Sequence, residues 1–162
     1  MTVEDLLSPA DATPLFSDDF EGDVSQWTLS EGWQYRDEAG NHFFEARPGN
    51  RRFQDDLALS TPIDLTGSAS PVLRYQSAHG LTRGASGRVQ VSVDEGATWT
   101  DVQVLEDTTD LAWVEQTVDL SAFAGQTILL RFHYEWIDLA TGGPFGNTLP
   151  SRVWRVDDVR IE

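Results

Sequence analysis

Hydrophobic and polar residues alternate along most of this chain with a period of two, the pattern of β-strands that bury one face. The clearest alternation ends at position 136, where every second residue is large and hydrophobic: Ile128, Leu130, Phe132, Tyr134 and Trp136. Between them lie Leu129 and three polar residues, Arg131, His133 and Glu135. We expect this stretch to be a central strand with its hydrophobic side facing the core.

Further strands follow from the same pattern, and turn signals recur every 8 to 14 residues. The expected strands are 27–29 and 33–35, as a pair or a looped edge, then 42–46, 57–65 with an edge or kink at Pro62, 73–75, 88–93, 99–104, 114–120 and 154–161. Gly80, Gly84 and Gly87 indicate a loop before the strand at 88–93. Because no segment keeps a helical period or repeats, the sequence predicts an all-β, antiparallel two-sheet sandwich of about nine to eleven strands.

The last strand changes phase. Trp154 and Val156 occupy even positions, whereas Val159 and Ile161 occupy odd ones. One extra residue in a strand produces such a slip, so the pattern predicts a β-bulge at Asp157-Asp158.

A turn with a recognisable signature lies between the strands at 88–93 and 99–104. A carboxylate and a glycine favour chain reversal there, because Asp94 can accept backbone hydrogen bonds and Gly96 can adopt a positive φ. The turn fits the pattern Ser-x-Asp-x-Gly-x-Thr-Trp through Ser92, Asp94, Gly96, Thr98 and Trp99. This resembles the Asp-box of sialidases and of several secreted β-domains. The resemblance implies a rigid hairpin corner without catalysis, since a sialidase needs several boxes and the 162-residue chain holds one.

Charge and composition narrow the function. The chain has 27 acidic residues against 11 arginines, no lysine and a formal charge of −16, which disfavours nucleic acid and anionic membranes as partners. It has no cysteine, so neither disulfides nor a thiol nucleophile are available. His42, His79 and His133 have no zinc-ligand spacing, and no 18-residue hydrophobic run predicts membrane insertion. A solvated acidic surface is the plain interpretation of the charge.

Six segments together resemble a known group of domains. In chain order they are 16–27 (FSDDFEGDVSQW), 59–65 (LSTPIDL), 73–75 (LRY), 92–99, 118–131 (VDLSAFAGQTILLR) and 154–161 (WRVDDVRI). They are similar to the MAM-like jelly-roll accessory domains of immune inhibitor A-type secreted peptidases and multidomain bacterial surface proteins. The resemblance implies a jelly-roll fold, an exported parent protein and, often, stabilisation by calcium. MAM domains proper carry cysteines, which this chain lacks.

Two acidic clusters are candidates for a calcium site. Calcium prefers six to eight oxygen ligands, which carboxylates in bent loops can supply. In the resembling domains the first and last strands run side by side, which would bring the clusters together. We therefore assign the ligand role first to Asp19, Glu21 and Asp158 and second to Asp23 and Asp157, with Asp55-Asp56 as a weaker candidate. The alternative is that these residues are solvated turn acids.

Aromatic and arginine side chains are the candidates for ligand binding. The chosen residues are Trp33, Tyr35, Arg51, Arg74 and Trp136, with Trp113 as a further possible platform for a sugar ring. Loops at 32–50 and 140–150 would carry the contacts. The alternative is that the tryptophans fill the core, as we expect of Trp27, Trp99 and Trp154, and that the arginines pair with carboxylates.

The predicted organisation is a leader or linker at 1–14 and one jelly-roll domain at 15–162. We expect a non-catalytic accessory module, calcium-stabilised and carbohydrate-binding, that is extracellular or at the cell surface and belongs to a longer exported protein with neighbouring domains. Its partner would be a glycan or a protein surface. The alternatives are a structural interdomain or oligomerisation domain and, more distantly, a small glycoside or ester hydrolase. An exposed aromatic face would favour the binding module, a large apolar patch the structural domain, and a cleft with two carboxylates the hydrolase.

Overall fold

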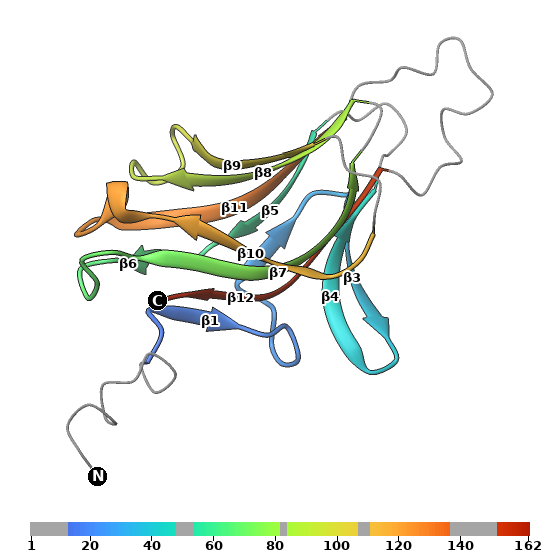
Figure 1. The fold of residues 1–162 in the computed structure, drawn as a ribbon, viewed down its shortest axis with the longest axis horizontal. Helices are drawn as coiled ribbons and strands as arrows, with labels where there is room; N and C mark the ends of the chain where they lie inside the picture. Colours follow the sequence, from blue (N-terminus) through green and yellow to red (C-terminus); the bar gives the residue numbers. More distant parts are fainter. Residues whose placement is uncertain (1–12, 48–53, 82–83, 107–110, 137–151) are drawn as a thin grey trace.

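The computed structural model describes residues 13–47, 54–81, 84–106, 111–136 and 152–162 of the chain. Within these ranges it contains twelve β-strands and one short 3-10 turn at Ser121–Phe123. The strands form two antiparallel sheets, layered as Figure 1 shows. No helix in the described part of the chain is long and hydrophobic enough to span a membrane.

The first sheet contains six strands. Five follow the spatial order β10 (Val114–Asp119), β7 (Val72–Leu81), β12 (Arg152–Ile161), β4 (Asn41–Ala46) and β3 (Trp33–Glu38). The sixth, β1 (Phe16–Asp18), pairs with β12. The first and last strands of the domain therefore lie side by side (Figure 1).

The second sheet also contains six strands. Its order is β2 (Trp27–Leu29), β5 (Gln54–Leu59), β11 (Thr127–Trp136), β8 (Ala85–Ser92) and β9 (Thr100–Glu106), and β6 (Ile63–Asp64) pairs with β11. The two sheets form a jelly-roll sandwich, which confirms the fold class predicted from the sequence.

The core lies between the sheets and is rich in aromatic rings. The hydrophobic side of β11 faces it as predicted, since all five of its large residues are at most 5% exposed. Phe132 lies at the centre, with its ring centroid 5.1 Å from that of Tyr75 and 5.7 Å from that of Trp154. These contacts join β11 of the second sheet to β7 and β12 of the first.

Two expected details of the chain path are wrong. The strands at 27–29 and 33–35 do not pair: β2 joins β5, and β3 joins β4 in the other sheet. Gly80 and Gly87 lie inside β7 and β8 rather than in a loop. Packing explains the second case, because a Cβ on Gly87 would lie 2.7 Å from the Trp154 ring. A glycine at such a position permits close approach of backbone and ring and does not mark a loop.

The predicted hairpin turn and the predicted bulge are both present. Ser92 Oγ accepts a hydrogen bond from Gly96 N at 2.8 Å, and Asp94 Oδ1 accepts one from Thr98 N at 2.8 Å. The bonds that the Asp94 carboxylate accepts, chiefly from the Thr98 hydroxyl and then from Thr98 N and the Ser92 hydroxyl, lower the pKa of Asp94 to about 2. In β12 the pairing with β7 shifts register between Asp157 and Arg160, and Asp158 has a φ of 49°.

Candidate functional site

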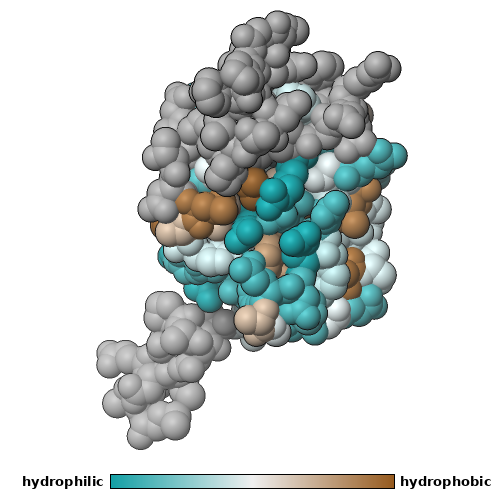
Figure 2. All heavy atoms as spheres, turned by 90° about the vertical axis from the view of Figure 1, so that its right-hand side faces the viewer, coloured by the Kyte–Doolittle hydropathy of each residue, from teal (hydrophilic) through white to brown (hydrophobic). Residues whose placement is uncertain are grey.

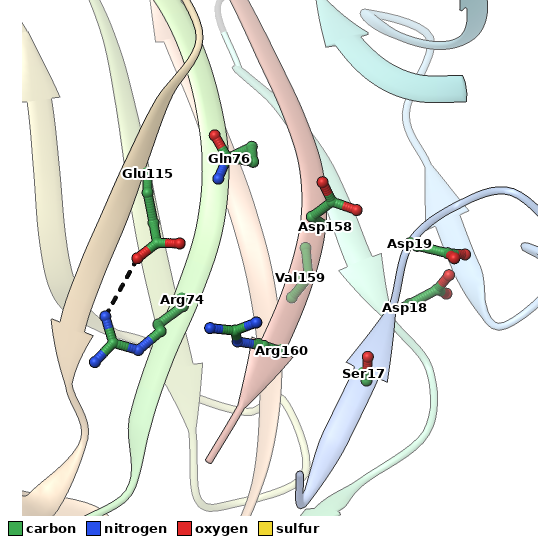
Figure 3. A pocket seen from close by; sticks show the side chains of 9 residues that line it. All are labelled: Ser17, Asp18, Asp19, Arg74, Gln76, Glu115, Asp158, Val159 and Arg160. Carbon is green, nitrogen blue, oxygen red and sulfur yellow. Dashed lines mark hydrogen bonds and ion pairs between the residues drawn. The ribbon is translucent and has the colours of Figure 1, made fainter. Parts of the chain in front are cut away.

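The pairing of β1 with β12 places acidic residues from both ends of the chain along one edge of the first sheet. Asp18 lies opposite Val159, so the turn that begins at Asp19 runs beside the bulge at Asp158. A hollow of about 190 Å³ opens there. It is lined by Ser17, Asp18, Asp19, Arg74, Gln76, Glu115, Asp158, Val159 and Arg160. In Figure 3 the acids of β1 and β12 gather on one side, and Arg74 and Arg160 lie on the other.

Four acids from the two predicted clusters repel one another at this edge. We call Asp19, Glu21, Asp157 and Asp158 the acidic edge. Asp157 is 4% exposed, and its pKa is raised to about 6. Burial is the main cause, and the negative charges of Asp158 and Glu21 add to it. Burial, followed by the charges of Asp19 and Glu21, also raises the pKa of Asp158. The structure thus brings together the segments that the sequence proposed as one cation site.

The acidic edge is not arranged around a single ion. Both carboxylate oxygens of Glu21 accept hydrogen bonds from His42, one from the backbone N at 2.8 Å, and this contact lowers the pKa of Glu21. Asp157 Oδ2 accepts a bond from Asn41 Nδ2 at 3.0 Å. Asp23 lies in its own exposed turn, where Ser25 N donates to it at 2.9 Å. Among the described residues, no three His, Asp or Glu side chains form a ready group of metal ligands.

Asp55 and Asp56, the weaker metal candidate, point to different places. Asp55 is 1% exposed and accepts a hydrogen bond from Gly32 N at 3.1 Å. Asp56 contacts His133 on the outer side of the second sheet. Neighbours in a strand alternate between faces, so these two acids cannot share one ion.

The residues predicted to bind a ligand do not lie together in one site. Trp33 and Trp136 are 3% and 5% exposed, so they belong to the core and cannot form an exposed platform, which corrects that expectation. Tyr35 is 40% exposed, and its ring stacks on His42 with centroids 5.3 Å apart. Arg74 lines the hollow and lies 3.3 Å from Glu115. Arg51 and the 140–150 loop lie outside the described residues.

The sequence analysis missed a connected set of polar side chains on the outer side of the second sheet. We call it the polar face. It comprises Asp56 of β5, Arg88 and Gln90 of β8, Asp101 of β9, Arg131, His133 and Glu135 of β11, and the ring of Trp99. The polar residues of β11 gave the one signal in the sequence, but their partners became visible only through strand pairing.

His133 joins two carboxylates at the centre of the polar face. Its Nδ1 lies 2.5 Å from Asp56 Oδ1 and its Nε2 lies 2.9 Å from Glu135 Oε1. With a carboxylate oxygen as the partner of each ring nitrogen, this geometry favours the imidazolium form, in which both nitrogens donate. Burial alone would lower the pKa of His133, but the bonds to Asp56 and Glu135 outweigh it and raise that pKa.

Arginine and glutamine side chains continue the polar face toward β9. Arg131 Nε donates to Gln90 Oε1 at 2.6 Å, and Gln90 Nε2 donates to Asp101 Oδ1 at 2.7 Å. Arg88 Nη1 also donates to Asp101, at 2.5 Å. The Arg131 guanidinium lies 4.2 Å from the centroid of the half-buried Trp99 ring. Trp99 therefore belongs to this face and not to the core, which corrects the expectation for it.

The charges of the polar face balance. Three carboxylates, those of Asp56, Asp101 and Glu135, face two guanidiniums and one imidazolium. This is unusual on a chain whose formal charge is −16. The face thus presents donors and acceptors beside an indole ring without a strong local field.

The fold resembles solved carbohydrate-binding and adhesin domains. No protein-family model and no curated protein matches this chain. The K1 cleaved adhesin domain of Lys-gingipain from Porphyromonas gingivalis W83 is 16% identical, with a TM-score of 0.62 over 91% of this chain and 96% of that one. The CBM22-1 xylan-binding domain of Paenibacillus barcinonensis Xyn10C is also 16% identical, with a TM-score of 0.55 over 93% and 94%. A family 61 carbohydrate-binding module solved with β-1,4-galactotriose has a TM-score of 0.53 at 16% identity, over 87% and 90%. At these identities the likeness is one of fold.

Proposed function

We propose that this domain is a non-catalytic carbohydrate-binding module and that it binds a neutral glycan on the polar face. The observation that carries the proposal is the connected, charge-balanced set of hydrogen-bonding groups beside the Trp99 indole. Sugar hydroxyls donate and accept hydrogen bonds at once, so they suit a surface where carboxylates, an amide and guanidiniums alternate. The fold shared with carbohydrate-binding modules supports the same assignment.

The arrangement of the carboxylates supports binding rather than hydrolysis. A glycosidase needs one carboxyl group that holds a proton and a second that stays ionised. On the polar face both Asp56 and Glu135 accept hydrogen bonds from the same imidazolium, His133. The two carboxylates therefore share one partner and do not have the two contrasting environments that a glycosidase pair requires.

We also propose that the acidic edge binds calcium. Support comes from the mutual repulsion of Asp157 and Asp158 with Asp19 and Glu21, which a dication would relieve. The ion would draw Glu21 away from His42, and Asp23 would stay in its own turn. The expected outcome is a rise in melting temperature on adding calcium, which a chelator reverses and Asp158→Ala abolishes.

The wider setting is part of the proposal. A MAM-like accessory role in an exported protein, with a peptidase or another hydrolase as a neighbouring domain, fits a binding module of this fold. A purely structural role has less support: on the side seen in Figure 2, hydrophilic side chains gather across the middle of the described surface and hydrophobic ones form separate smaller areas. The open reading frame around this segment would test the setting.

A glycan array followed by titration calorimetry tests the function. The first probes are β-1,4-galactotriose and cellotriose, the sugars bound by two modules of this fold. Arg131→Ala should weaken binding by about tenfold or more, because it removes the guanidinium that contacts Trp99 and Gln90. Arg160→Ala, on the other sheet and 47% exposed, is the matched control. Hydrolysis of a glycoside or ester substrate that depends on one carboxylate would overturn the proposal.

A further inference from the structure

The outer side of the first sheet carries an exposed tryptophan that the proposed function does not use. Trp113 is 40% exposed and comes one residue before Val114, which pairs with Ser77 of β7. Trp113 therefore lies across from Ala78, whose small side chain leaves room for the indole. The indole reaches the Phe43 ring of β4, with centroids 5.4 Å apart and the planes at 79°.

Phe43 holds this indole on a rigid base. It is 2% exposed, although it lies on the outer side of the sheet, between Trp113 and the Arg155 guanidinium, which is 5.2 Å from its centroid. Arg155 is fixed in turn, because its Nε donates to Glu45 Oε2 at 2.7 Å. The indole is thus a preorganised flat surface, and a ligand that stacks on it need not order it first.

Positive charge gathers around Glu45, which bonds to the Arg155 guanidinium that lies over Phe43. Three of the 11 arginines, Arg36, Arg47 and Arg155, surround the carboxylate of Glu45, at 4.0, 2.6 and 2.7 Å. Arg155 also lies 3.5 Å from the exposed Glu38, which leaves Arg36 and Arg47 as the arginines available to a ligand. Burial alone would raise the pKa of Glu45, but the bonds to Arg47 and Arg155 outweigh burial and lower that pKa below its ordinary value. This carboxylate is therefore ionised. It is 1% exposed, whereas the side chains of Arg36 and Arg47 are 48% and 52% exposed. The Arg36 and Arg47 side chains therefore face solvent while their counter-ion, Glu45, is buried.

We infer that this surface, made of Trp113, Phe43, Arg36, Arg47 and Arg155, binds a pyranose that carries a carboxylate, such as a hexuronic acid. The hydrophobic face of the sugar would stack on Trp113, and its carboxylate would pair with the exposed guanidiniums. A chain at −16 repels dense polyanions, which favours a ligand with one carboxylate per ring over a more highly charged polymer. The site lies on the sheet opposite to the polar face and is independent of the proposed function.

Titration calorimetry with trigalacturonate tests this site, with its methyl-esterified form as the probe of equal shape and no charge. Wild type should bind trigalacturonate about tenfold more tightly than the ester, and the preference should shrink as salt is raised. Trp113→Ala should weaken binding of both by about tenfold. The double variant Arg36→Gln/Arg47→Gln should weaken only the charged probe.

Controls separate this site from the polar face and from loss of folding. Arg131→Ala should leave trigalacturonate binding unchanged, so a failure of the glycan proposal for the polar face would not affect the result. Trp113→Phe, which keeps a flat ring beside Phe43, should retain part of the affinity and melt close to wild type. Trp113→Ala uncovers part of Phe43, so its binding is compared at a temperature where its melt shows it to be folded. Equal affinity of wild type and Trp113→Ala, or equal competition by hexaglutamate, would overturn the inference.

Discussion

The acidic edge makes the stability of the protein depend on pH in a direction that can be worked out. Asp157 has a pKa of about 6 in the folded state, against an ordinary value of 3.8. The folded protein therefore holds a proton there that the unfolded chain has released, and the free energy of unfolding falls as pH rises between about 4 and 6. Asp157→Asn removes this titration and should flatten that part of the profile.

The size of the effect follows from the shift. Two pKa units correspond to about 3 kcal/mol, and roughly half of it, about 1.4 kcal/mol, is lost between pH 5 and pH 8. For a domain of this length that is a fall of about 3–6 °C in melting temperature. Calcium should offset the loss, because it stabilises the ionised form; at a hundred times its dissociation constant it adds about 2.7 kcal/mol.

The assay is thermal melting at pH 5 and pH 8, with calcium and with chelator. It compares wild type with Asp157→Asn and Asp23→Asn. Asp23→Asn is the control, since its carboxylate is exposed and bonded to Ser25. We expect the pH-dependent fall to be smaller in Asp157→Asn alone and the calcium increment to be lost with it. Identical pH profiles in wild type and Asp157→Asn would refute the electrostatic argument, and an unchanged melting temperature with calcium would refute the metal site.

Three other predictions concern single positions. Asp94→Ala removes the acceptor that closes the hairpin turn and should lower the urea midpoint of unfolding; an unchanged midpoint would contradict the role of the turn. Gly87→Ala drives a Cβ into Trp154 and should cost about 1–3 kcal/mol, whereas Gly22→Ala, with nothing within 4 Å, should be near neutral. His133→Gln should remove the part of the stability that wild type loses as pH rises through the raised pKa of His133; imidazole nitrogen shifts that show a neutral ring at pH 6 would contradict the imidazolium.

The strands were predictable because period-two alternation reports burial directly. Every second residue of β11 is in the core, and the phase slip at Asp157-Asp158 is a bulge, as the residues indicate. What the pattern could not supply was the partner of a short strand. Trp27 and Trp33 are six positions apart and yet belong to different sheets, because the choice of partner depends on contacts distant in the sequence.

The candidate sites were predictable to different degrees. The acidic edge followed from the resemblance, which implied that the first and last strands are neighbours. The polar face did not, because Asp56 and His133 are 77 positions apart and only sheet pairing brings them together. The sequence also could not predict which tryptophan is exposed. Nothing in the pattern separated Trp113 from Trp33 and Trp136, but of these three Trp113 is 40% exposed and the other two are buried.

The central claim is that the polar face binds a neutral glycan, and an amide chemical-shift titration tests it most directly. A nitrogen-15 labelled sample would be titrated with β-1,4-galactotriose, with cellotriose and with the strongest neutral ligand from the array. The account predicts that the largest shifts fall on β5, β8 and β11 around Gln90 and His133, together with the Trp99 indole N–H signal. Saturable shifts confined to other parts of the molecule, or none with any neutral glycan, would contradict it.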